Sequence, residues 1–124
     1  MKRNIELGNA IDERLSAALE RANYQLTLNN QKQHARQKLD ADLIYATNGG
    51  IFKVGPELIS FISTLISMEH EDGVILDMNK NPIDVPDLKN FLQDIVAHYY
   101  EAMNDFMLEF KKIQKARKTD QLVS

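Results

Sequence analysis

The stretch Leu43-Ile44-Tyr45-Ala46-Thr47-Asn48-Gly49-Gly50-Ile51-Phe52-Lys53-Val54 decides the fold that the sequence predicts. β-Branched and aromatic residues flank Asn48-Gly49, a dipeptide that readily supplies the positive φ angles of a tight hairpin turn. We therefore expect a β-hairpin over residues 43–54. A phosphate-binding loop is the alternative for these glycines, but its Gly-Lys-hydroxyl sequence and following helix are absent.

A short helix and a second hairpin are expected next. Pro56 suits the first position of a helix, because its missing N–H costs nothing there. The wide apolar face of this helix marks it as a core element. Its members are Leu58, Ile59, Phe61, Ile62, Leu65 and Ile66. Residues 74–85 then predict a hairpin with its turn at residues 78–81, and Pro82 places the returning strand at an edge.

A long helix is expected before the first hairpin, from Asn9 to Asp42. Asn9 is a suitable N-cap, and acidic residues follow it near the positive end of the helix dipole. A narrow apolar seam runs along the first half of this helix. It consists of Ile11, Leu15, Ala18, Leu19, Ala22 and Leu26. From Asn29 to Lys38 only Ala35 is apolar, so we expect this segment to be solvated or to face a partner protein.

The strongest helical pattern is the last one, over residues 86–118. A single apolar stripe follows three- and four-residue steps along it. The stripe comprises Leu88, Phe91, Leu92, Ile95, Val96, Tyr99, Met103, Phe106, Phe110 and Ile113.

The predicted fold is α+β and mainly helical, in the order α-ββ-α-ββ-α. We expect one domain over residues 1–124, with two long antiparallel helices flanking a small head. Its parts are an N-terminal arm (1–8), a long helix (9–42), the ββαββ head (43–85), a second long helix (86–118) and a tail (119–124).

Composition narrows the class of protein. The 124 residues are 44% hydrophobic and 27% charged, as in soluble single domains. The chain has no Cys, which excludes disulfides and thiolate chemistry, and it has no apolar run long enough to span a membrane. No secretory signal is recognised, so we expect a cytoplasmic protein.

Charge is distributed unevenly along the chain. Residues 55–110 carry two basic residues against eleven acidic ones, whereas residues 111–124 carry five against one. An acidic middle and a basic end can orient partners or subunits electrostatically.

The apolar stripe of the last helix is broader than the first helix can cover, which predicts a homo-oligomer. The predicted interface is Tyr99, Met103, Phe106, Met107, Phe110 and Ile113. We expect a non-enzymatic interaction or assembly protein that also binds another protein, with no catalytic residues, no cofactor and no metal.

Two polar clusters offer alternatives to this interpretation. Glu69-His70-Glu71-Asp72 has metal-ligand chemistry, but adjacent residues at a helix end point apart, which favours a solvated terminus. His98 and Glu101 share a helix flank and offer an acid/base pair, which a solvated contact three residues apart explains equally.

A second function class is a nucleic-acid accessory protein. His34 lies among Lys32, Arg36 and Lys38, and a basic run closes the last helix. The run is Lys111, Lys112, Lys115, Arg117 and Lys118. It offers phosphate contacts, but few aromatics are interleaved, and cations also complement the negative end of a helix dipole.

Three stretches carry a resemblance: Asn4-Ile5-Glu6-Leu7-Gly8-Asn9-Ala10, Ala22-Asn23-Tyr24-Gln25-Leu26-Thr27-Leu28 and Asn48-Gly49-Gly50-Ile51-Phe52. They are similar to small uncharacterised proteins of marine contractile-tailed phages, cyanophages included. The resemblance implies expression in a host cytoplasm and a role in virion assembly or phage DNA metabolism, and it transfers no active site. The chain also resembles prefoldin subunits, in which β-hairpins join two long helices, but here a helix separates the hairpins.

Overall fold

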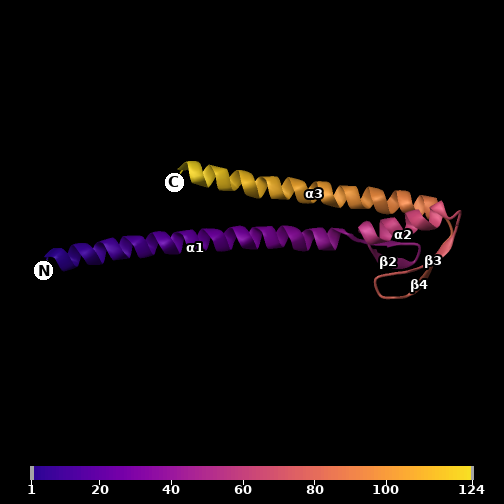
Figure 1. The fold of residues 1–124 in the computed structure, drawn as a ribbon, viewed down its shortest axis with the longest axis horizontal. Helices are drawn as coiled ribbons and strands as arrows, with labels where there is room; N and C mark the ends of the chain where they lie inside the picture. Colours follow the sequence, from indigo (N-terminus) through magenta and orange to yellow (C-terminus); the bar gives the residue numbers. More distant parts are fainter. Residues whose placement is uncertain (1, 124) are drawn as a thin grey trace. The chain divides into compact units, whose positions relative to one another are not determined.

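The computed structural model describes the backbone of residues 2–123 and the side chains of residues 10–116. Its elements are α1 (Lys2–Asp42), β1 (Ile44–Thr47), β2 (Gly50–Lys53), α2 (Pro56–Ser67), β3 (Gly73–Leu76), β4 (Pro82–Val85) and α3 (Leu88–Val123) (Figure 1). The predicted order α-ββ-α-ββ-α and the mainly helical α+β class are confirmed.

The chain divides into two units. Residues 1–34 hold the greater part of α1 and no other element. Residues 35–124 hold the last turns of α1, both hairpins, α2 and α3, and the hydrophobic core lies within this second unit.

Both long helices extend further than the sequence pattern predicted. α1 begins at Lys2 rather than at Asn9, so the predicted arm is helical from residue 2. A capping residue does not have to begin a helix. Gly8 before it costs only about 1 kcal/mol in a helix, and Lys2, Arg3, Glu6 and Leu7 are good helix formers, so extending an existing helix through them costs little. α3 begins at Leu88 and continues to Val123, so the predicted tail is helical to that residue for the same reason.

The first hairpin forms as predicted. β1 pairs antiparallel with β2, and Tyr45 lies opposite Phe52. Asn48 and Gly49 have φ angles of 54° and 81°. Positive φ at both central residues matches the two-residue turn that suits the right-handed twist of a hairpin. β3 and β4 form a separate antiparallel pair, with Leu76 opposite Pro82.

The two hairpins are joined through Ile51. Its N–H donates to Oδ2 of Asp77 (3.2 Å), and its carbonyl accepts the N–H of Met78 (2.8 Å). Beside this joint, a Cβ on Gly50 would lie 2.6 Å from Cγ1 of Ile83. Gly50 is therefore more than a turn residue, since its missing side chain leaves the space that Ile83 of the other hairpin occupies.

The core combines side chains from β2, α2, β3, β4 and α3. Its edge-to-face pair, Phe52 and Phe91, has ring centroids 5.2 Å apart and an interplanar angle of 67°. The buried members are Phe52, Val54, Ile62, Ile75, Val85, Leu88, Phe91 and Ile95. α2 packs on α3, as expected for a core helix, although Phe61 on its predicted apolar face is 50% exposed.

Candidate functional site

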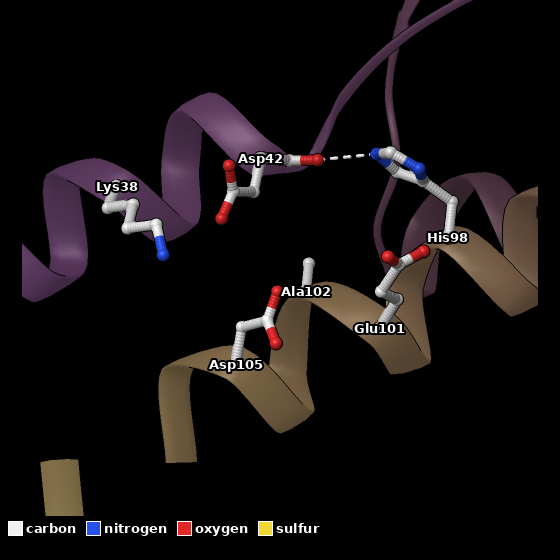
Figure 2. Close-up of a pocket in the computed structure, with 6 residues that line it drawn as sticks. All are labelled: Lys38, Asp42, His98, Glu101, Ala102 and Asp105. Atoms are coloured by element: carbon white, nitrogen blue, oxygen red, sulfur yellow. Dashed lines mark hydrogen bonds between the residues drawn. The ribbon is translucent and has the colours of Figure 1, made fainter. Parts of the chain in front are cut away.

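A polar pocket lies where the last turns of α1 meet the middle of α3, inside the second unit. Its volume is about 210 Å³, and Figure 2 shows the side chains that surround it. Neighbouring turns of each helix supply these side chains, because residues three or four apart share a helix face. They are Lys38 and Asp42 from α1 and His98, Glu101, Ala102 and Asp105 from α3.

His98 connects three elements at this pocket. Its Nε2 donates to the backbone carbonyl of Asp42, the last residue of α1 (Figure 2). Because a carbonyl only accepts, Nε2 carries the hydrogen. The imidazole also stacks on Tyr45 of β1, with ring centroids 4.6 Å apart and an interplanar angle of 23°. His98 therefore holds the end of α1 and the first hairpin against α3.

This geometry changes the interpretation of His98 and Glu101 as a pair. Both residues line the pocket, but the hydrogen bond of His98 goes to Asp42 rather than to Glu101. Among the side chains of residues 10–116, no three His, Asp or Glu residues converge closely enough to hold a metal ion. The arrangement supports a polar contact between helices, with an imidazole whose Nε2 is used structurally.

The cluster Glu69-His70-Glu71-Asp72 forms the C-terminal cap of α2. Glu69 has a φ of 67°, and its N–H donates to the carbonyl of Ile66 while the N–H of His70 donates to that of Leu65. These two bonds are those of a Schellman cap, here with glutamate where glycine is usual. The carbonyl of Glu71 then accepts the N–H of Leu88 at the start of α3 (3.0 Å). The backbone groups of this cluster therefore cap α2 and bond to the start of α3.

An apolar groove of about 660 Å³ lies on another side of the second unit. The end of α1, β2, the start of α2 and the middle of α3 surround it. Its lining residues are Leu39, Leu43, Lys53, Val54, Gly55, Pro56, Glu57, Leu58, Tyr99 and Met103. Two residues of the predicted interface, Tyr99 and Met103, are therefore placed in this groove, and both are half-buried.

The other predicted interface residues follow along α3. Phe106 and Phe110 are half-buried, with ring centroids 6.0 Å apart. Ile113 is buried, whereas Met107 is 53% exposed. The predicted interface therefore combines a covered part with an exposed part, and the adjacent Leu108, 58% exposed, adds to the exposed part.

The structure describes three of the five side chains of the predicted basic run. Lys111, Lys112 and Lys115 are exposed, and Nζ of Lys112 lies 3.6 Å from Oε1 of Glu109. The side chains of Arg117 and Lys118 lie outside the described residues.

Asp77 is the structurally important polar residue that the sequence pattern did not identify. It is 8% exposed, and its carboxylate accepts the backbone N–H groups of Ile51, Asn79 and Asn81, the last two at 2.9 Å. The hydrogen bond from Asn81 is the main reason that the pKa of Asp77 lies below its ordinary value, against the opposing effect of burial. An Asp that bonds to backbone N–H groups two residues on is a recognised turn signal, so part of this role was visible in the sequence.

Comparisons with protein families, with curated proteins and with solved structures find no match to this chain. In the described part of the chain, none of the helices is both long and apolar enough to cross a membrane.

Proposed function

We propose that this chain is a non-enzymatic interaction protein that self-associates through its long helices and acts in the assembly of a larger complex. The observation that carries the proposal is a set of exposed apolar side chains on each of the two long helices.

The chemical nature of the exposed surface supports the same proposal. Large aliphatic side chains on both long helices are more than half exposed, among them Leu15 and Leu19 on α1 and Met107 and Leu108 on α3. Single exposed apolar residues are ordinary, but repeated ones along one helix are typical of interaction surfaces. We therefore assign the exposed apolar part of the predicted α3 interface to contacts between molecules.

Light scattering over a wide range of protein concentration tests the proposal. We expect a mass above 14.2 kDa that rises with concentration. A strictly monomeric chain at the highest concentration would refute self-association. The double variant Met107→Ser/Leu108→Ser should shift the distribution toward monomer, whereas the control Asn104→Ser, at an exposed position of the same helix, should leave it unchanged.

The kind of complex that we propose is based on the resemblance described above. Similarity to small proteins of contractile-tailed phages supports a role in virion assembly inside the host cytoplasm. Nucleic-acid binding through Lys111, Lys112 and Lys115 is the alternative. A salt series with double-stranded DNA separates the two, because phosphate contacts make affinity fall steeply with salt.

A further inference from the structure

The apolar seam of α1 is exposed along its whole length. We call Ile11, Leu15, Ala18, Leu19, Ala22 and Leu26 the α1 seam. The four large side chains Ile11, Leu15, Leu19 and Leu26 are 61%, 57%, 56% and 59% exposed. At 3.6 residues per turn, all members fall within an arc of about 100° on the helix surface. The seam is therefore one continuous apolar strip, and it contains no charged residue.

A helix with such a strip gains much of its stability from covering it. Residues 1–34 form a unit that contains only helix α1. Isolated helices are marginal in water, and helical stability in proteins comes mostly from packing of the apolar face. We infer from this that the α1 seam is a contact surface.

We propose that a second copy of this chain covers the α1 seam, with the two helices antiparallel about a two-fold axis between residues 18 and 19. The inference rests on the proposed self-association and names the surface of α1 that takes part in it. A two-fold interface must be self-complementary, since the same strip is used by both copies. The α1 seam meets this requirement in the sizes of its side chains.

In the antiparallel arrangement, large side chains face small ones. Leu15 lies at the height of Ala22 of the second copy, and Ala18 lies at the height of Leu19 of the second copy. Ile11 and Leu26 face each other at the two ends. Large residues opposite small ones interdigitate without voids, which is how well-packed helix interfaces are filled.

The parallel arrangement in register fits less well. Leu15 would face Leu15 of the second copy, and Leu19 would face Leu19. Ala18 and Ala22 would likewise each face the same alanine of the second copy. Crowded layers would then alternate with layers of alanine, which leave cavities that reduce stability. The distribution of sizes along the α1 seam therefore selects the antiparallel direction.

The charges beside the seam favour the same direction. Antiparallel pairing places Asp12 at the height of Gln25 and Arg14 at the height of Asn23. Parallel pairing would place each charged residue at the height of the same residue of the second copy, where like charges repel. The antiparallel helices thus avoid repulsion at these heights.

Cysteine cross-linking distinguishes the two directions, because the chain has no cysteine of its own. A disulfide needs Cα atoms within about 7 Å. A mixture of the Ile11→Cys chain and a tagged Leu26→Cys chain should yield the mixed cross-link. Ile11→Cys alone should not cross-link, since its two copies would be about 22 Å apart along the helices. Efficient cross-linking of Ile11→Cys alone would overturn the antiparallel arrangement, and Glu13→Cys, off the seam, serves as the uncross-linked control.

A second variant tests the surface without cysteine. Leu15→Glu/Leu19→Glu keeps good helix formers but places charges in the seam. We expect its mass by light scattering to fall from twice 14.2 kDa toward 14.2 kDa, with some loss of helical content, because the seam of α1 then has no cover. Ala17→Glu, an exposed position outside the seam, should remain dimeric. If the wild-type chain associates and Leu15→Glu/Leu19→Glu still associates, the α1 seam is not the contact surface, while the proposed function stands. A monomeric wild-type chain refutes the proposed function itself.

Discussion

The contact between Phe52 and Phe91 should be the main link between the first hairpin and α3. Each ring is 1% exposed, and the pair meets edge to face at 5.2 Å. Replacing either by alanine would cost about 3–5 kcal/mol. A unit of this size has a total free energy of unfolding of only about 5–13 kcal/mol. The informative change is therefore Phe to Leu, which keeps most of the apolar volume and costs under about 1.5 kcal/mol at each site.

A double-mutant cycle isolates the contribution of the pair. An edge-to-face aromatic contact is worth about 0.5–1.5 kcal/mol beyond buried area. The double variant Phe52→Leu/Phe91→Leu should therefore lose less stability than the two single losses added together, by about that amount. Urea unfolding can be followed by tyrosine fluorescence, because the chain has no Trp and Tyr45 and Tyr99 both pack against the core.

Additivity would refute this reasoning. Single and double losses that agree within about 0.5 kcal/mol would mean that the two rings act independently. A second cycle between Phe91→Leu and Leu108→Ala provides the control, because Leu108 is 58% exposed and its replacement should change the free energy of unfolding little and additively.

Four further changes test the remaining contacts. The pKa of Asp77 is lowered in the folded chain, so its carboxylate stabilises the fold at pH values above the unfolded pKa of about 3.9, and this stabilisation is lost as pH falls. The difference in urea midpoint between wild type and Asp77→Asn should therefore shrink from about pH 6 to about pH 3. A difference that stays constant over this range would contradict this. Glu69→Gly should raise the free energy of unfolding by roughly 0.5–1 kcal/mol, because glycine adopts the positive φ of this cap without strain; a lower melting temperature would argue against the cap. Gly50→Ala should cost about 1–3 kcal/mol through its clash with Ile83; Ile83→Ala removes both atoms that the new Cβ would meet, so in thermal melting it should cost less in the Gly50→Ala background than in the wild type. His98→Phe keeps a ring on Tyr45 but removes the bond to the α1 carbonyl, so urea unfolding should show a loss of about 0.5–1.5 kcal/mol, and no loss would mean that the bond contributes nothing.

Local signals predicted most of the elements. Asn48-Gly49 and Pro56 impose backbone conformations on their own positions, and the structure has the turn and the helix start where they indicate. The end of α2 was harder to predict, because Glu69 adopts the left-handed conformation that normally favours glycine. The predicted start of α1 at Asn9 was wrong for a related reason, because a local preference did not decide the backbone conformation. Asn9 favours a cap and Gly8 disfavours a helix, but neither is a barrier as strong as proline, and the helix continues to Lys2.

Contacts between distant residues could not be predicted from spacing. The bond from Ile51 to Asp77 crosses 26 positions, and that from His98 to Asp42 crosses 56. Sequence periodicity assigns a face to each residue, but it does not show which element that face will meet. The same limit applies to Gly50, whose close neighbour Ile83 belongs to the other hairpin.

The length of the long helices is what the core leaves unexplained. Every buried residue of the core cluster lies between Phe52 and Ile95, yet α1 has 41 residues and α3 continues to Val123. A helical residue with no apolar contact contributes little to stability, because the gain from its hydrogen bond is nearly balanced by the loss of conformational freedom. Helix outside the core is therefore stabilised by whatever covers its apolar residues. On α1, Leu28 and Ala35 are buried, whereas the large side chains of the α1 seam are exposed. The second copy proposed above would cover this seam, with large side chains of one copy opposite small ones of the other.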